Sequence, residues 1–175
     1  MGIRKASLYH HFPQKDDLLY ALCVDSLSRI GSAVEEAIDW QDDPIDQLLA
    51  VIGAHLRATL ADQDMHATML SELRSINPAR ITEVVALRNA YETLVHDVIR
   101  EAQAGGALRS YISSRQLTLA LLNLLNWTIF WFRFDGTMSV PELRTTLTSI
   151  FVEGAAAPAA SGPPRPQRLI VRPDG

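Results

Sequence analysis

The sequence has almost no cysteine: one residue, Cys23, in 175. A single cysteine cannot form an internal disulfide or an all-cysteine metal site, and it is compatible with a reducing compartment. No signal peptide is visible at the start, so we expect a cytoplasmic protein. Cys23 lies on the apolar stripe of its predicted helix, which favours an inert core thiol.

An excess of positive charge is also lacking. The chain has 16 Lys and Arg against 20 Asp and Glu, for a net charge of −4. No global attraction to nucleic acid is therefore expected. Any contact with DNA must be local, and the basic cluster that suits it lies at the N-terminus.

Catalytic and metal-binding motifs are absent from the sequence. The five histidines form no H-E-x-x-H pair, and the adjacent His10 and His11 point in different directions on a helix. There is no G-x-S-x-G, P-loop or dinucleotide-binding pattern. We therefore expect no enzyme, no cofactor and no metal site.

Strand patterns and long apolar runs are lacking as well. No stretch alternates apolar and polar residues with β-branched enrichment, so no strand is predicted. Residues 117–134 are long enough to raise the question of a membrane span, but they include Asn123, Asn126 and Arg133. A span needs about 20 mostly apolar residues. We favour instead a helix buried between a core and a partner chain.

Apolar residues spaced three and four apart predict an all-α protein. The expected helices cover residues 4–11, 15–39, 44–61, 65–75, 78–103, 113–134 and 140–153. Three of them should begin with a proline that follows a capping residue: Asp43, Asn77 or Ser139. Five prolines fall in residues 155–175, which predicts a disordered tail.

The most specific pattern is the N-terminal stretch MGIRKASLYHHFPQKDDLL, residues 1–19. Leu8 and Phe12 are four residues apart and would share one face of a short helix, which Pro13 ends. The opposite face is then polar, basic and aromatic, as suits DNA phosphates and base edges. The alternative is a solvated basic patch at a frayed terminus.

The order G-I-x-K-x-S-L-Y-x-H-F-P-x-K-x-x-L-L closely resembles the end of the helix-turn-helix in TetR-family transcriptional regulators. Arg4 departs from this pattern, which usually has a small capping serine there. The resemblance implies that seven residues bind DNA: Arg4, Lys5, Ser7, Tyr9, His10, His11 and Lys15.

The same resemblance implies three regions. Residues 1–38 would be part of a DNA-binding domain with its connecting helix, residues 39–154 a ligand-binding and dimerisation domain, and residues 155–175 the tail. The two helices that precede the reading helix in that family are missing, so we expect an N-terminally truncated chain. The intact protein is expected to be a ligand-responsive repressor that binds operator DNA. The alternative is a helical ligand-binding module without DNA binding.

In TetR-type regulators the last two long helices pair with those of a second chain. The helices over residues 113–134 and 140–153 would fill that role here. The expected homodimer positions are Leu121, Leu125, Thr128, Leu147 and Phe151. The alternative is that these side chains fill the core of a monomer. We favour the dimer, because the first of these helices has more apolar surface than one core can cover.

The pattern from Leu124-Leu125-Asn126-Trp127 through Trp131 to Asp135-Gly136 resembles a subgroup that senses coenzyme A thioesters. It implies a small apolar effector, with an acyl-coenzyme A as one possibility. Candidate ligand-binding residues on predicted inner helices are His55, Met65, His66, Met69, Arg88, Tyr91, Asn123, Trp127 and Trp131. Aromatic residues at helical spacing are more often simple core, so Trp127, Phe130, Trp131 and Phe134 are expected mostly in the core.

Overall fold

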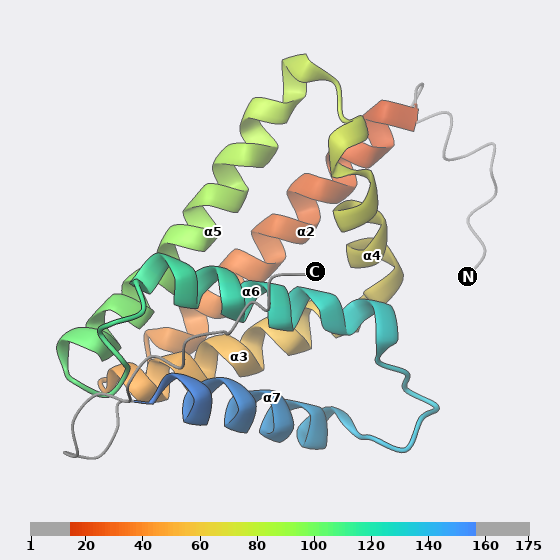
Figure 1. Cartoon of the computed structure of the whole chain (residues 1–175). Coiled ribbons are helices and arrows are strands. Elements are labelled where there is room, and N and C mark those ends of the chain that lie inside the picture. The colour runs from red at the N-terminus through yellow and green to blue at the C-terminus, as the bar shows by residue number, and fades with distance from the viewer. Residues whose placement is uncertain (1–14, 157–175) are drawn as a thin grey trace, which may run out of the picture.

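The structure of the chain, a computed structural model, describes residues 15–156, apart from the side chain of residue 74 (Figure 1). Within that range the chain forms α2 (Lys15–Ile38), α3 (Pro44–Ala61), α4 (Gln63–Glu72), the 3₁₀ turn η1 (Leu73–Ser75), α5 (Pro78–Ala104), α6 (Ser114–Trp131) and α7 (Val140–Ala155). The predicted all-α fold is confirmed. The predicted helix over residues 4–11 and most of the predicted tail lie outside the described residues.

Side chains that satisfy free backbone N–H groups set the starts of the helices. The three predicted caps are confirmed: Asp43, Asn77 and Ser139 each accept a hydrogen bond from a backbone N–H of the following turn, and a proline sits in that turn. Ser113 caps α6 in a reciprocal capping box with Gln116, a cap that was not predicted from the sequence.

The helix α6 ends at Trp131, three residues earlier than predicted. Phe132 is extended and buried. The side-chain amide of Gln63 donates hydrogen bonds to the carbonyl oxygens of Ile129 (2.6 Å) and Phe132 (2.9 Å). A residue far back in the chain therefore satisfies carbonyl groups that another helical turn would otherwise have paired.

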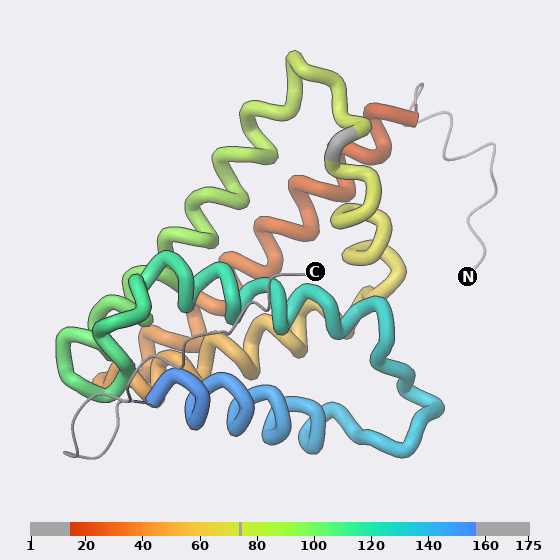
Figure 2. The backbone as a smooth tube through the Cα atoms, viewed as in Figure 1, coloured from red at the N-terminus to blue at the C-terminus, as the bar shows by residue number. Residues whose placement is uncertain are grey.

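The central element is α3, which contacts each of the other five α-helices described. Figures 1 and 2 show α2 and α5 running away from it side by side, α6 crossing in front of it and α7 running below. Six consecutive residues of α3, 51–56, are buried. Polar groups in that stretch have no access to water, so they depend on protein or ligand partners.

Buried apolar side chains form two clusters. The larger one joins α3 and α7 to parts of α2, α5 and α6. The smaller one joins the N-terminal half of α2 to α4 and to the start of α5, and it contains Leu19, Cys23 and Val84. Burial raises the pKa of the Cys23 thiol, in agreement with an unreactive core cysteine.

The five positions expected at a dimer interface lie inside the single chain. All are at most 7% exposed: Leu121, Leu125, Thr128, Leu147 and Phe151. The face of α6 that carries the first three packs toward α3 and α7. The structure thus corrects the prediction and favours the alternative, in which these side chains fill the core of the protomer.

The large aromatic residues of α6 occupy the opposite, outer side of the helix. Trp127 is 64% exposed and Trp131 is 47% exposed, and Phe130 and Phe134 are exposed as well. The expectation that these four residues lie mostly in the core is wrong. The reason is that α6 is apolar on nearly all sides, so its periodicity does not decide which face turns inward.

None of the helices within residues 15–156 has the length and hydropathy of a membrane span.

Replacing Leu121 by alanine should lower the free energy of unfolding by about 2–5 kcal/mol, because a fully buried side chain is lost and leaves a cavity. Trp127→Ala removes a larger but exposed side chain and should cost the isolated protomer no more than about 0.5 kcal/mol. Urea unfolding followed by circular dichroism, at dilutions that keep the chain monomeric, measures both. Equal losses would contradict this placement of α6.

Candidate ligand-binding cavity

A cavity of about 290 Å³ lies where α2, α3, α4, α5 and α6 meet. It occupies the seam between the two apolar clusters: Leu27 and Met69 belong to the smaller, Ile30 and Tyr91 to the larger. The remaining lining residues are His55, Leu70, Leu73, Arg88, Glu92, Leu119, Leu122, Asn123 and Asn126.

His55 is a polar side chain that lines this cavity. It is fully buried, and its Nδ1 lies 2.7 Å from the hydroxyl oxygen of Tyr91. Its Nε2 is buried without a hydrogen-bond partner among the described residues. An unpaired buried polar atom costs roughly 1–3 kcal/mol. A ligand atom that hydrogen-bonds Nε2 would remove that cost.

Burial lowers the pKa of His55 to about 3; the charge of His66 adds to this shift, and the side chain of Asn126 opposes it, because it is close enough to interact with the ring although it forms no well-aligned hydrogen bond with Nε2. The imidazole is therefore neutral at physiological pH. One ring nitrogen of a neutral imidazole donates and the other accepts. His55 thus offers the cavity one uncharged hydrogen-bonding atom, which suits a carbonyl or hydroxyl group on an otherwise apolar ligand.

His66 lies outside the cavity, although it was a ligand-binding candidate. Its Nδ1 is 2.5 Å from the hydroxyl oxygen of Ser26, and its Nε2 is 3.1 Å from the carbonyl oxygen of Ala58. Both ring nitrogens thus have protein partners, and the ring joins α4 to α2 and α3. His66 is a core residue that holds the cavity walls together.

The other candidates divide in the same way. The cavity brings together His55, Met69, Arg88, Tyr91 and Asn123. It is not lined by Met65, which is half-buried, or by Trp127 and Trp131, which lie on the outer face of α6. Among the polar lining residues, Glu92 and Asn126 were not predicted from the sequence. Asn126 lies three residues after Asn123, a spacing that places both on one side of α6 and could have indicated it.

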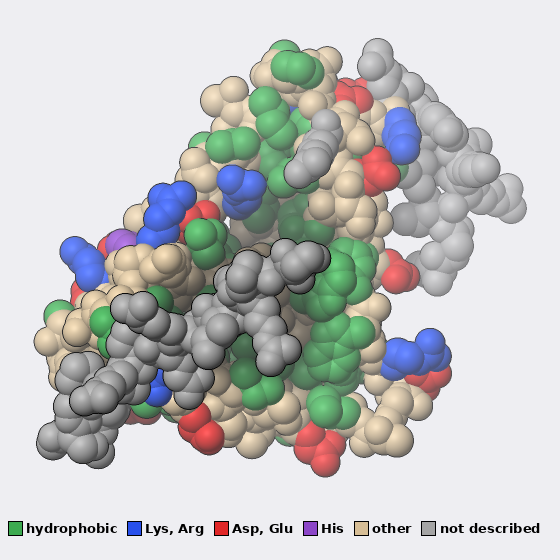
Figure 3. Space-filling model, in the orientation of Figure 1, with side chains coloured by type: hydrophobic (Ala, Val, Ile, Leu, Met, Phe, Trp, Pro, Cys, Tyr) green, Lys and Arg blue, Asp and Glu red, His purple; other side chains and the backbone are tan. Residues whose placement is uncertain are grey.

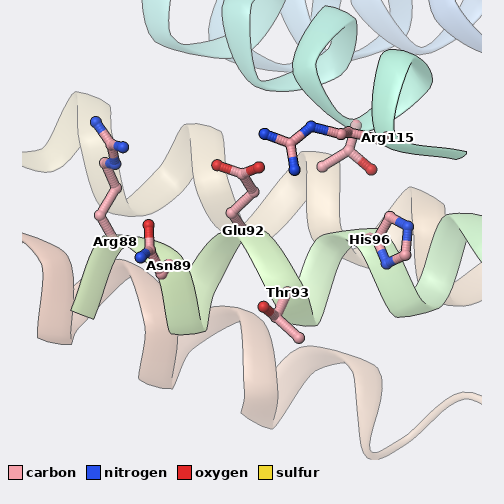
Figure 4. Close-up of a pocket in the computed structure, with 7 residues that line it drawn as sticks. Arg88, Asn89, Glu92, Thr93, His96 and Arg115 are labelled. Carbon is pink, nitrogen blue, oxygen red and sulfur yellow. The ribbon is translucent and has the colours of Figure 1, made fainter. Parts of the chain in front are cut away.

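A second, more polar hollow of about 430 Å³ lies on the outside, between α5 and α6. Figure 4 shows Arg88 and Glu92 rising from α5 toward α6, and Arg115 reaching back from α6 above them. Arg88 and Glu92 line both this hollow and the inner cavity. The other lining residues are Asn89, Thr93, His96 and Thr118.

Within residues 15–156, no three His, Cys, Asp or Glu side chains gather where they could hold a metal ion. The cavity combines apolar walls, the neutral His55, the amides of Asn123 and Asn126, and the charged Arg88 and Glu92 at the side shared with the outer hollow. Its chemistry suits the binding of a small, mostly apolar molecule.

The model of the family "Tetracyclin repressor-like, C-terminal domain" matches residues 41–155, more than half of the chain. The chain belongs to the TetR family of transcriptional regulators. The match covers the cavity-lining residues of α3 to α6.

Individual TetR-family proteins resemble this chain over most of their length. PfmR from Thermus thermophilus is 30% identical with a TM-score of 0.77, over 87% of this chain and 82% of PfmR. The transcriptional repressor KstR2 of Rhodococcus jostii is 24% identical, over 90% of this chain and 78% of KstR2. AibR, solved with isovaleryl coenzyme A and operator DNA, shares the fold at 17% identity and a TM-score of 0.71, over 85% and 80% of the two chains.

Of the seven DNA-binding candidates in this TetR-family chain, Lys15 is the one within the described residues. It is exposed at the start of α2, and its Nζ lies 3.9 Å from a carboxylate oxygen of Glu72. The other six, Arg4, Lys5, Ser7, Tyr9, His10 and His11, lie outside the described residues.

The stability of the chain should depend on pH through His55. Above pH 6.5, its ordinary pKa, the ring is neutral in both the folded and the unfolded chain. Below that pH the unfolded chain binds a proton that the folded chain does not bind until about pH 3. Stability therefore falls as pH falls through this range, by up to about 1.4 kcal/mol per pH unit from this residue.

The variant His55→Gln tests this expectation, because it keeps a polar side chain but removes the titration. Urea unfolding at several values between pH 6.5 and about 5 should give a flatter dependence for the variant than for the parent protein. His66, whose pKa burial also lowers, continues to contribute in both proteins. Parallel curves would show that His55 titrates alike in the folded and unfolded chains.

Proposed function

We propose that this TetR-family regulator is a cytoplasmic repressor that binds operator DNA as a homodimer and releases it when an apolar small molecule enters the cavity beside His55. The observation that carries this proposal is the cavity itself, with a buried ring nitrogen that lacks a partner among the described residues. The proposed DNA contacts are those implied by the N-terminal motif: Arg4, Lys5, Ser7, Tyr9, His10, His11 and Lys15.

The proposed effector carries an acyl group and is delivered as a coenzyme A thioester. The inner cavity, at about 290 Å³, is near the lower limit of small-molecule sites, which suits a compact apolar group. A thioester carbonyl oxygen could accept a hydrogen bond from His55. The similarity to AibR, solved with isovaleryl coenzyme A, supports this class of effector.

The proposed route from ligand to DNA is α2, since Leu27 and Ile30 on this helix line the cavity. The start of α2 is attached to α5: Asp16 accepts a hydrogen bond of 3.0 Å from the backbone N–H of Asn77, and Asp17 pairs with Arg80. A ligand that prefers a shifted α2 would change the spacing of the two reading helices of a dimer. Because half-sites lie about 34 Å apart on DNA, a small shift suffices to weaken binding.

The proposed homodimer uses the exposed apolar patch at the C-terminal end of α6. Figure 3 shows hydrophobic side chains gathered over the C-terminal half of α6. The large members of this patch are Trp127, Phe130, Trp131 and Phe134. Exposed patches of this kind mark interaction surfaces. A two-fold axis would let two copies cover each other's patch.

Placing a charge in this patch should prevent dimer formation. Trp127→Glu would bury an unpaired carboxylate at the interface, so the variant should sediment as a monomer where the parent chain sediments as a dimer. Trp40→Glu is the matched control, because Trp40 is 81% exposed beyond the end of α2 and is not among the residues of the patch. Analytical ultracentrifugation distinguishes the species. A dimer that survives Trp127→Glu but not Trp40→Glu would place the interface elsewhere.

The repressor function is tested by fluorescence anisotropy with DNA from the region upstream of the gene. The intact protein should bind this DNA, and octanoyl-coenzyme A should release it. Lys15→Ala should weaken binding and reduce the slope of log affinity against log salt by about 1, as expected for one lost phosphate contact. A folded dimer that binds none of this DNA would contradict the proposal and favour a ligand-binding module without DNA binding.

The role of His55 in this response is tested with the double variant His55→Leu/Tyr91→Phe. Removing both partners of the buried hydrogen bond avoids leaving one unpaired. The variant should bind DNA as the parent chain does but need more octanoyl-coenzyme A for release. An unchanged response would mean that the effector does not contact this part of the cavity.

A further inference from the structure

The outer hollow between α5 and α6 contains two arginine side chains without acidic partners. Neither Arg88 nor Arg115 lies within 4.0 Å of a carboxylate among the described residues. Glu92 is the acidic residue in the lining, and it likewise forms no ion pair in the described chain. With two arginines and one glutamate in its lining, the hollow therefore carries a net positive charge.

The positions of Arg88 and Glu92 connect this hollow to the inner cavity. The two residues are one helical turn apart on α5 and line both spaces, whereas Tyr91 between them faces His55. A single ligand could therefore place one part against His55 and another part between Arg88 and Arg115. Figure 4 shows the side chains of both arginines directed into the space between the two helices.

The inner cavity and the outer hollow suit the two different parts of an amphipathic ligand, one apolar and one charged. The inner cavity is lined mainly by apolar side chains, with the uncharged polar groups of His55, Asn123 and Asn126 and, where it meets the outer hollow, Arg88 and Glu92. The outer hollow offers two guanidinium groups, with His96 held beside them by a 2.8 Å hydrogen bond to Ser114. Guanidinium groups bind phosphate and carboxylate oxygens through paired N–H donors.

We propose that Arg88 and Arg115 bind the anionic head of an effector whose apolar group occupies the inner cavity. The protein then selects amphipathic anions over neutral apolar molecules of the same chain length. Glu92 lies between the two arginines in Figure 4 and repels the same head, so it limits the affinity. This inference rests on the proposed function, since it assigns a second subsite to the same effector.

Three probes with the same acyl chain test the inference: octanoyl-coenzyme A, octanoic acid and methyl octanoate. Calorimetric titration of the full chain should show tighter binding of the charged probes than of the neutral ester. Arg88→Ala and Arg115→Ala should each weaken binding of the thioester about tenfold, as expected for the loss of a charge-assisted contact. Binding of the ester should not change.

A change in the opposite direction provides a sharper test. Glu92→Gln removes the repulsion without removing a donor, so it should strengthen binding of the charged probes about threefold and leave the ester unaffected. The matched control is Arg100→Ala, because Arg100 lies on the same helix, pairs with Asp97 and lines neither space. It should bind all three probes as the parent chain does.

Comparing the acid with the thioester also identifies which anionic group of the ligand binds the arginines. Weaker binding of both the acid and the thioester in Arg88→Ala would place a carboxylate or a phosphate at Arg88. Weaker binding of the thioester alone would identify the phosphates of the coenzyme. Either result supports the inference.

Equal affinity for the ester and the thioester, unchanged by Arg88→Ala or Arg115→Ala, would overturn the inference. The proposed function would still stand if any of the probes releases DNA. If none of the probes binds or releases DNA, both are overturned. Circular dichroism of each variant checks its fold, which should be preserved because both arginines are exposed.

Discussion

The position of α3 inside a shell of five helices is the constraint on which the rest of the structure depends. Residues 51–56 of this helix have no exposed side, so its one ionisable side chain there, His55, has to be neutral and has to find its partners within the fold. Tyr91 of α5 satisfies one ring nitrogen, and the cavity adjoins the other. The same packing therefore leaves His55 Nε2 without a well-aligned hydrogen bond in the described chain, and the side chain of Asn126 is the neighbouring group with which a ligand would compete.

The walls of the cavity are held by polar contacts that cross the apolar clusters. His66 joins α4 to α2 and α3, and Gln63 fastens the end of α6 through two carbonyl oxygens. These bonds are buried or half-buried, so water competes with them weakly and they fix the positions of four helices around the seam. A hydrophobic group that enters the seam leaves these bonds in place. It can thus be accommodated there at little cost to the contacts that hold the helices together.

The features that could be predicted from the sequence are those determined by near neighbours in the chain. The caps Asp43, Asn77 and Ser139 act within one turn, and helix positions follow from apolar spacing, so these predictions agreed with the structure. The orientation of α6 could not be predicted in this way, because both of its sides are apolar. The distinction between His55 and His66 also depends on distant partners: Ser26 and Ala58 satisfy His66, whereas nothing in the described chain satisfies His55 Nε2. The cavity residues were recognised as a polar set on inner helices, but only packing decided which of them meet.

The position of the cavity on α6 connects the proposed ligand to the proposed dimer. Leu121 and Leu125 face the core and Trp127 faces outward, while Asn123 and Asn126, which line the cavity, lie next to the outward side of the helix. Because Asn126 and Trp127 are adjacent on a rigid helix, a ligand that displaces the cavity face also displaces the outer face. The same ligand contacts α2 through Leu27 and Ile30. In the proposed homodimer, the distance between the two reading helices depends both on the contact between the α6 helices and on the position of α2 in each chain. A ligand that binds one arrangement of α2 and α6 more tightly than another changes the spacing of the reading helices without contacting DNA. The size of this change is limited by the difference between the two affinities.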